Sequence, residues 1–376
     1  MKHHQGKYLA KKPVVQKTTN RAKKAAIVFI ILTVVLVLLA ASIGIFLWYS
    51  SSVRGSMFAA RSSILATVPQ PDASDSAGSE ATETSAPIPA DWIDKDGVAY
   101  KYRDDVISIL VMGIDYMSDE RHWDSKMISN GGNADVIGLV ILNPKTFDFS
   151  ILYIPRDTMA DVIAMDADGN YIDTVRTNIS TAHSYGDGKE LSCELALDAV
   201  SQLLYGVPVN RYAALDYNAL YTLNKIIGGL TITFAEDYTY INSAYTKGTT
   251  VTMNSEQMCR FITYRNLNDV SGAYDRGARN MSVLKALFEQ CKDAIVADPT
   301  VALNMVSQLG SNLTTDLDLS EITFLARNIG KMSFNSDTII HIPGESVMGE
   351  KYAEFYPDEQ WLHDFVVDNF CVPLEQ

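Results

Sequence analysis

The chain has 376 residues, of which 31 are basic and 45 are acidic, so its formal net charge is −14. Eight of the basic residues lie in residues 1–24, which leaves 23 − 45 = −22 for the remainder. A body this acidic argues against a nucleic-acid partner, because binding to the phosphate backbone depends on positive charge. Any phosphate site must therefore be a local cluster of arginines.

The N-terminal segment predicts a membrane anchor. Residues 25–49 form a nearly unbroken apolar run that ends in Trp48 and Tyr49. A bilayer core needs about 20 such residues in a helix, and the basic residues before the run place the N-terminus in the cytoplasm. A cleaved signal peptide is the alternative, but its apolar region is usually about 7–15 residues long. We therefore expect a single-pass plasma-membrane protein whose main domain is extracellular.

The rest of the chain is expected to fall into three parts. Residues 50–91 are predicted to be an extracellular disordered linker, because this stretch is dominated by Ser, Ala, Thr, Pro and acidic residues without periodicity. Residues 92–300 are predicted to form the catalytic domain. Residues 301–376 contain no interpretable motif and are expected to form a C-terminal α/β extension packed on the core.

The four cysteines do not suggest a zinc site, because they are far apart and form no CxxC pair. They are Cys193, Cys259, Cys291 and Cys371. An extracellular location would permit disulfides, but buried free thiols are the favoured interpretation.

Apolar runs and helical spacings alternate along the outer part. Strands are expected, in chain order, at Val106–Met112, Val136–Leu142, Phe149–Ile154, Tyr212–Leu215, Leu230–Phe234 and Thr338–Ile342. Helices are expected at Leu191–Tyr205, Tyr217–Ile227, Asn254–Tyr264 and about Ala278–Val296, with two or three more after Thr300. The turn at Asn143–Thr146 predicts an antiparallel hairpin. This pattern indicates an α/β fold in which a mixed central β-sheet is covered by helices on both faces, an α-β-α sandwich, preceded by one transmembrane helix.

Two carboxylates follow or begin predicted strands. Asp115 comes directly after a buried strand and Gly113, and Asp135 lies at the start of the next strand. Side chains at such strand ends often form active sites in α/β sheets. A turn-forming aspartate and a strand cap are the structural alternatives. As a pair, the two residues predict a magnesium site, because Mg²⁺ takes one or two protein carboxylates together with phosphate oxygens and water.

Several arginines are candidates for binding phosphate, for which the guanidinium fork is suited. Arg156 and Asp157 follow Pro155 at the end of the third predicted strand, where an ion pair on the rim is the structural alternative. Arg176 is a weaker candidate. Arg265 ends a predicted helix, whereas Arg276 and Arg279 lie near a predicted helix start, where free N–H groups attract anions. A solvated basic face is the structural alternative for these arginines.

The order of these segments resembles the LytR-CpsA-Psr family of cell-wall ligases. Members of this family carry a short cytoplasmic tail, one anchor and an extracellular domain, in which a strand ending in Gly-x-Asp precedes Arg-Ser-Asp, Ser-Ile-Pro-Arg-Asp and an arginine-rich stretch. The resemblance covers about residues 104–287. The matching segments are Gly113-Ile114-Asp115, Ile154-Pro155-Arg156-Asp157, Leu215-Asp216-Tyr217 and Ile227-Gly228-Gly229-Leu230.

The resemblance implies a phosphotransferase that moves a phospho-glycopolymer from a polyprenyl diphosphate carrier to peptidoglycan, with loss of polyprenyl phosphate. Asp115 and Asp135 would hold Mg²⁺ or Mn²⁺. An apolar cavity between the sheet and its helices would take the lipid tail. The residues expected to act in catalysis are Arg156, Asp157 and Arg276. The residues expected to bind diphosphate are Arg156, Arg176, Arg265, Arg276, Arg279 and Asn280.

The chain also departs from the family pattern. Asn133-Ala134-Asp135 stands for Arg-Ser-Asp, Leu267 replaces a second arginine, and Asn280 replaces a glutamine. A lost charge-assisted contact to phosphate could remove about 1.5–3 kcal/mol. Two alternatives follow: a non-catalytic protein that binds polyprenyl or glycopolymer as a partner or sensor of wall assembly, and a diphosphate hydrolase, which could also be a side activity of the transferase.

Overall fold

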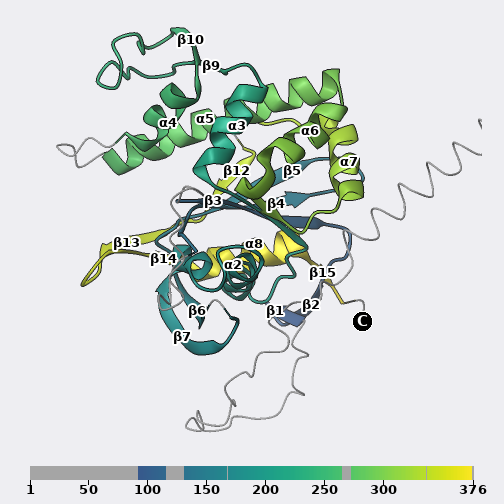
Figure 1. The fold of residues 1–376 in the computed structure, drawn as a ribbon. Helices are drawn as coiled ribbons and strands as arrows, with labels where there is room; N and C mark the ends of the chain where they lie inside the picture. Colours follow the sequence, from purple (N-terminus) through teal and green to yellow (C-terminus); the bar gives the residue numbers. More distant parts are fainter. Residues whose placement is uncertain (1–91, 116–130, 167, 265–271, 336, 375–376) are drawn as a thin grey trace, which may run out of the picture. The chain divides into compact units, whose positions relative to one another are not determined.

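The computed structural model describes residues 92–115, 131–166, 168–264, 272–335 and 337–374 (Figure 1). The predicted membrane anchor at 25–49 and the predicted linker at 50–91 lie outside these residues, as does Arg265. In the part of the chain that the structure describes, no helix combines the length and the apolar character needed to cross a bilayer.

A six-stranded mixed sheet forms the centre of the fold, in the order β11-β8-β3-β4-β5-β12. The strands β3, β4 and β5 pair antiparallel, whereas β8 is parallel to β3 and β12 is parallel to β5. The bounds are β3 (Ile107–Ile114), β4 (Ala134–Leu142), β5 (Phe149–Ile154), β8 (Arg211–Leu215), β11 (Leu313–Thr315) and β12 (Ile339–His341). The predicted mixed sheet and the predicted antiparallel hairpin of β4 and β5 are thus confirmed.

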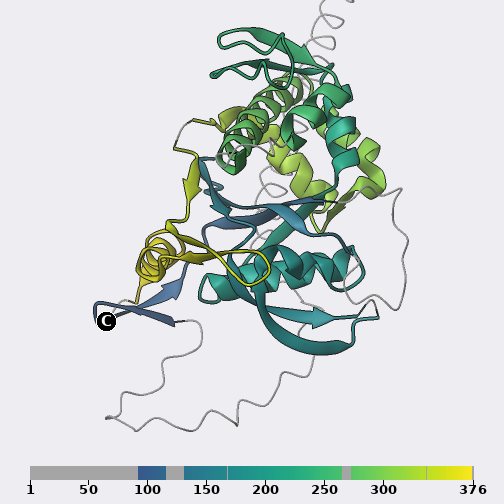
Figure 2. The same ribbon diagram turned by 90° about the vertical axis from the view of Figure 1, so that its left-hand side faces the viewer.

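Helices lie over both faces of this sheet (Figures 1 and 2). Figure 1 shows α2 and α8 on one face and α3, α5, α6 and α7 on the other. Their bounds are α2 (Glu190–Leu203), α3 (Tyr217–Ile226), α5 (Gly272–Ala297), α6 (Thr300–Leu309), α7 (Leu319–Asn328) and α8 (Glu359–Phe370). The alternation of side chains along each strand supplies one row of apolar groups to each layer of helices.

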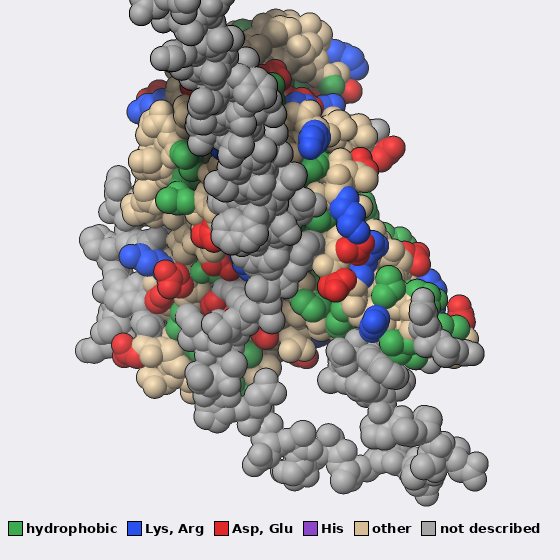
Figure 3. Space-filling view, turned by 90° about the vertical axis from the view of Figure 1, so that its right-hand side faces the viewer, with side chains coloured by type: hydrophobic (Ala, Val, Ile, Leu, Met, Phe, Trp, Pro, Cys, Tyr) green, Lys and Arg blue, Asp and Glu red, His purple; other side chains and the backbone are tan. Residues whose placement is uncertain are grey.

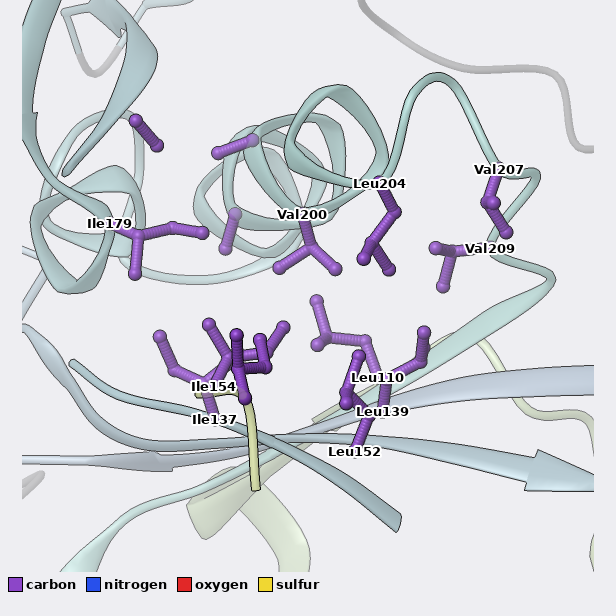
Figure 4. Packing of buried hydrophobic residues seen from close by; sticks show 14 of the residues in the cluster. Leu110, Ile137, Leu139, Leu152, Ile154, Ile179, Val200, Leu204, Val207 and Val209 are labelled. Carbon is purple, nitrogen blue, oxygen red and sulfur yellow. The ribbon is translucent and has the colours of Figure 1, made fainter. Parts of the chain in front are cut away.

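The face of the central sheet that lies toward α2 is fully buried. Leu110, Leu139 and Leu152 from three neighbouring strands are 0% exposed, and they interdigitate with Val200 and Leu204 of the α2 segment (Figure 4). Full burial of a side chain of this size is worth about 1.5–3 kcal/mol. This packing therefore fixes the strands that carry the candidate site.

The opposite face is covered less completely. Val111, Val140 and Ile151 point away from α2 and are only half-buried, and Val136 is 39% exposed. Near the far end of β5, by contrast, Phe149 packs against aromatic side chains from the helical layer, with 5.4 Å between its ring centroid and that of Phe288. This face is thus closed at one end and partly open along the rest of its apolar surface.

The segment after residue 300 belongs to the central sheet. It contributes both edge strands, β11 and β12, as well as α6, α7 and α8. It also contains a hairpin, β13 (Gly344–Met348) with β14 (Ala353–Pro357), and the last strand β15 (Cys371–Pro373). β15 pairs with β2 (Val98–Tyr102), which pairs in turn with β1 (Trp92–Lys95), so the two ends of the described domain meet in one small sheet.

An aromatic cluster holds a second group of elements together. It joins β9 (Leu230–Thr233), β10 (Thr250–Met253) and α4 (Ser255–Thr263), and it centres on Phe234 and Phe261, whose ring centroids are 5.5 Å apart. α4 begins with a capping box between Asn254 and Gln257, at the start of the helix that the sequence predicts. The cysteines are free thiols, and burial raises the pKa of Cys259, Cys291 and Cys371 to about 11.

Some elements differ from the expectations. The helix expected from about Ala278 begins at Gly272, because a glycine inside a helix costs only about 1 kcal/mol and does not stop propagation. The sequence did not predict the hairpin of β6 (Met159–Met165) and β7 (Tyr171–Asn178), in whose second strand only two of the eight residues are buried. Exposed strands lack the apolar alternation by which strands are recognised.

Charged side chains of both signs lie next to one another on the face of the molecule shown in Figure 3.

The ion pair between Arg211 and Glu321, in contrast, is buried. The Arg211 guanidinium on β8 binds Glu321 on α7 through two nitrogens, with Nη2–Oε1 at 2.7 Å, and the Glu321 side chain is 1% exposed. Glu321 also accepts the N–H of Asp318 in the capping box of α7. This pair joins the sheet to the helical layer.

We expect Glu321→Ala to lower the free energy of unfolding by about 3–5 kcal/mol, because it removes the carboxylate that pairs directly with the mostly buried Arg211. Chemical denaturation of the variant and the wild type measures this difference. Glu236→Ala is the control, since it removes an exposed pair with Lys247 and should change stability by about 1 kcal/mol or less. Equal effects of the two substitutions would contradict the structural role of the buried pair.

Candidate functional site

Three of the predicted site residues meet at one edge of the central sheet. Because β3, β4 and β5 are antiparallel in turn, the end of β3, the start of β4 and the end of β5 lie together. Asp115 follows β3, Asp135 is the second residue of β4, and Arg156 comes two residues after β5. The register shifts between Gly113 and Ile114, so that Asp135 lies at an irregularity of the ladder, which is how bulges re-aim side chains.

The Asp115 carboxylate is oriented by the neighbouring strand start. Its Oδ1 accepts the backbone N–H of Asn133 at 2.7 Å, and its own N–H donates to the Asn133 carbonyl at 3.0 Å. The Asn133 amide donates to its second oxygen at 3.4 Å. Asp115 is exposed, so it can contact a ligand while its direction is set by the backbone.

Arg156 lies between two carboxylates. Its Nη1 donates to Asp135 Oδ1, and its Nε is 3.4 Å from Asp157 Oδ1. The three side chains are about a third exposed, with values of 32% for Arg156, 26% for Asp135 and 39% for Asp157. The guanidinium is thereby held in one orientation and still faces solvent.

The loop before β4 is fixed by the short helix η3 (Ile179–Ser184), a support that the sequence did not predict. Gly131 N–H donates to the Ser184 carbonyl at 2.9 Å, and His183 Nδ1 lies 3.1 Å from the Gly132 carbonyl oxygen. A Cβ at Gly131 would lie 2.4 Å from the His183 carbonyl oxygen, so only glycine fits. His183 therefore has a structural contact here, and the Gly131-Gly132 pair was the sequence signal for this tight approach.

Arg176 lies on the β6–β7 hairpin and pairs with Asp161 across it, with 3.4 Å between Nη1 and Oδ1. Both side chains are exposed. The hairpin lies beside β14: a hydrogen bond to Glu354 raises the pKa of Tyr356, and the positive charge of Arg176 opposes that rise. The predicted diphosphate role of Arg176 stays a prediction.

Arg279 has structural contacts. Its side chain is 2% exposed, its Nε donates to the Phe261 carbonyl at 3.0 Å, and its Nη2 donates to the Tyr264 carbonyl at 2.7 Å. Its Nη1 contacts Tyr240 Oη at 3.1 Å. These carbonyls lie at the end of α4, where a helix leaves acceptors without intrahelical partners. The expectation that Arg279 lies at a helix start was wrong, because α5 begins seven residues earlier.

The other arginine-rich positions are placed only in part. Arg276 lies in α5, but its side chain is outside the described part of the molecule, and Arg265 is wholly outside it. Asn280 follows Arg279 in α5 and is half-buried. The predictions for these three residues stay predictions.

The carboxylates at the sheet edge have the chemistry of a hard-cation site. Asp115, Asp135 and Asp157 against Arg156 give −3 + 1 = −2 for the described side chains of this cluster. Among the described residues, no group of three or more His, Cys, Asp and Glu side chains has the arrangement of a complete metal site. A pair of carboxylates with water and phosphate oxygens is the usual way in which Mg²⁺ is held, so the donor set fits this ion.

Comparison with known proteins identifies a family. The model of the LytR_cpsA_psr family matches residues 73–366. A polyisoprenyl-teichoic acid–peptidoglycan teichoic acid transferase TagU from Oceanobacillus iheyensis is 26% identical over 256 residues, which is 67% of this chain and 72% of that protein. The transferase TagU from Halalkalibacterium halodurans is 22% identical over 272 residues, which is 72% of this chain and 81% of that one.

Solved structures show the same fold. The crystal structure of Bacillus subtilis TagV matches with a TM-score of 0.51 and 21% identity, over 70% of this chain and 97% of that one. A crystal structure of a Streptococcus agalactiae protein matches with a TM-score of 0.53 and 20% identity, over 70% and 88% of the two chains. The mixed sheet and its helices therefore follow a known architecture.

We expect Arg279→Ala to lower the free energy of unfolding by about 2–5 kcal/mol, because it leaves buried carbonyls unpaired and a cavity beside Phe261. Denaturation curves measure this loss. The matched control is Arg260→Ala, which removes an exposed arginine from α4 and should have little effect. Unchanged stability together with lost binding of a diphosphate would instead assign Arg279 to the ligand.

Proposed function

The chain belongs to the LytR-CpsA-Psr family, and from this premise we propose that it transfers a phospho-glycopolymer from a polyprenyl diphosphate carrier to peptidoglycan. The names of its relatives support transfer of a glycopolymer to peptidoglycan. The observation that carries the proposal for this chain is the meeting of Asp115, Asp135 and Arg156 at one edge of the sheet.

The reaction that we propose forms one bond and breaks one. A hydroxyl oxygen of the acceptor attacks the phosphorus that carries the glycopolymer, the bond to the bridging oxygen of the diphosphate breaks, and polyprenyl phosphate leaves. Such a transfer depends mainly on positioning and on neutralising charge on the phosphate oxygens. Arg156 would provide this charge, since its orientation is already set by Asp135 and Asp157. The carboxylates at this edge, which are all at least partly exposed, would accept the proton of the attacking hydroxyl.

A divalent cation is part of the proposal. The described cluster carries a charge of −3 + 1 = −2, and a diphosphate would add more negative charge. Mg²⁺ or Mn²⁺ held by Asp115 and Asp135 would neutralise charge on the diphosphate oxygens. Asp115 is suited to this contact because its carboxylate is exposed and oriented by Asn133.

The carrier lipid would lie against the partly open face of the sheet. Val111, Val136 and Ile151 offer an apolar surface there that the helices cover incompletely. β3 and β5 end at the candidate diphosphate site and β4 begins there, so a lipid tail along this face would lead to Arg156. The predicted anchor at residues 25–49 would hold the domain at the outer membrane surface, where carrier and peptidoglycan meet.

One observation supports a second candidate. Asn133 stands where the family pattern has an arginine, and its amide contacts Asp115, so this edge has one positive charge fewer than the pattern implies. A protein that binds the carrier or the glycopolymer without turnover would tolerate this loss.

We expect Arg156→Ala to reduce transfer by about 100-fold or more, the usual effect of removing a group that stabilises charge in the transition state. The assay uses the full-length chain in detergent with Mg²⁺, a polyprenyl-diphosphate oligosaccharide and peptidoglycan fragments. Release of polyprenyl phosphate and the mass of the phospho-linked product are followed.

Asp115→Asn should lower turnover in the same assay and raise the Mg²⁺ concentration needed for half-maximal turnover.

Arg327→Ala is the control, because it removes an exposed arginine from α7, away from the sheet edge. Full activity of Arg156→Ala would contradict the proposed site. Binding of the carrier without product in the wild type would favour the second candidate. Phosphorylated saccharide released without acceptor would indicate a diphosphate hydrolase.

A further inference from the structure

A buried asparagine lies behind the candidate diphosphate site. Asn178 is the last residue of β7 and is 6% exposed. Its Nδ2 donates to Asp157 Oδ1 at 3.1 Å and to the Ala353 carbonyl at 3.0 Å. Both partners are oxygen acceptors, so only the NH₂ end of the amide can face them, and the orientation of the side chain is fixed by its contacts.

The carbonyl oxygen of the Asn178 amide does not stabilise the fold. Asn178 Oδ1 is buried and has no hydrogen-bond partner among the residues that the structure describes. A buried acceptor without a partner destabilises a fold, whereas an apolar side chain of similar size would not. The two donor contacts therefore point to a role at Asp157 rather than to a contribution to packing.

Asp157 connects Asn178 to Arg156. Asp157 Oδ1, which accepts from Asn178, also lies 3.4 Å from Arg156 Nε, and the far side of the guanidinium contacts Asp135. An arginine side chain loses much rotational freedom when it binds a ligand, and a side chain that is already held loses less. A fixed Asp157 would thus keep Arg156 in its binding orientation before substrate arrives.

The β13–β14 hairpin also holds Asp157 in place. Phe355 N–H on β14 donates to the Asp157 carbonyl at 2.8 Å, and Thr158 pairs with Phe355 in a parallel bridge. Phe355 is buried in the main core, so the hairpin is anchored there. The backbone and the carboxylate of Asp157 are therefore both held by groups that belong to or contact β14.

We propose that Asn178 is a positioning residue, which acts through Asp157 to hold the Arg156 guanidinium for a diphosphate and ties it to the β13–β14 hairpin. The proposal rests on the proposed function for the identity of the ligand. It predicts that the effect of changing Asn178 depends on the presence of Asp157. A residue that only supported the fold would act independently of Asp157.

The test measures binding of farnesyl diphosphate, in the presence of Mg²⁺, to the full-length chain and its variants. Asn178→Ala is expected to weaken binding about tenfold, and Asp157→Ala by a similar factor. In the double variant the two factors should not multiply, so that its affinity equals that of Asp157→Ala, as for residues that act as one unit. Multiplication of the two factors, or no effect of Asn178→Ala, would overturn the proposal.

Asn178→Asp provides a second measurement should the alanine variant fold poorly, because it keeps the side-chain volume and places a carboxylate against Asp157. It should weaken binding more than tenfold in the wild-type background and much less in the Asp157→Ala background. An equal loss in both backgrounds would show that Asn178 does not act through Asp157. Melting temperatures identify the variants that are folded at the temperature of the assay.

Asn170→Asp is the matched control. Asn170 lies at the turn end of the same β6–β7 hairpin and likewise donates from Nδ2 to a carboxylate, at 2.9 Å to Asp166 Oδ2, but it is exposed. Its substitution should leave binding unchanged. Farnesyl diphosphate binding is measured without an acceptor, so a chain that binds it but shows no transfer would fail as a transferase and still test the role of Asn178.

Discussion

The alternating direction of three neighbouring strands is the constraint on which the candidate site depends. Because β3, β4 and β5 run antiparallel, residues at positions 115, 135 and 156 reach the same edge although loops separate them in the chain. The sealed packing of α2 on Leu110, Leu139 and Leu152 fixes the register, and a slip by one residue would turn these leucines to the other face. The core therefore sets the positions at which the site residues leave the sheet.

The parallel strands extend this arrangement. β8 is parallel to β3 and β12 is parallel to β5, so the ends of both strands lie at the edge that carries Arg156. Asp216 caps α3 directly after β8, and the β13–β14 hairpin begins shortly after β12. The C-terminal segment consequently reaches the site because it supplies an edge strand of the same sheet.

The sequence predicted the parts of the fold that are buried. The runs around Leu110, Leu139 and Leu152 were recognisable because the core buries these strands and makes them nearly continuous apolar runs, and the start of α4 at Asn254 was recognisable because a capping box is a local hydrogen-bond pattern. The β6–β7 and β13–β14 hairpins were not, since β13 is exposed throughout, only two of the eight residues of β7 are buried, and neither strand shows apolar alternation. Exposed strands are stabilised by their partners, which a local pattern does not reveal.

The candidate site was likewise predictable only where its residues adjoin apolar strands. Asp115, Asp135 and Arg156 follow or begin apolar strands, so their positions along the chain indicated a shared edge. Arg279 resembles them in sequence, yet its donors bind carbonyls at the end of α4, a contact that depends on how two helices pack. Asn178 was not among the predicted site residues, because its contacts are with two acceptors, Asp157 and Ala353, that lie 21 and 175 residues away.

A site with this charge balance has a physical consequence. Arg156 is attracted by two carboxylates, and a diphosphate must compete with both for the same guanidinium. Competition of this kind weakens binding unless the carboxylates gain another partner when the ligand enters. A cation at Asp115 and Asp135 would be such a partner on one side, and the Asn178 amide already provides one for Asp157 on the other. With a cation bound as proposed, the arginine would contact phosphate while neither carboxylate is left without a partner, and Asp115, Asp135, Arg156 and Asn178 would act as one electrostatic arrangement.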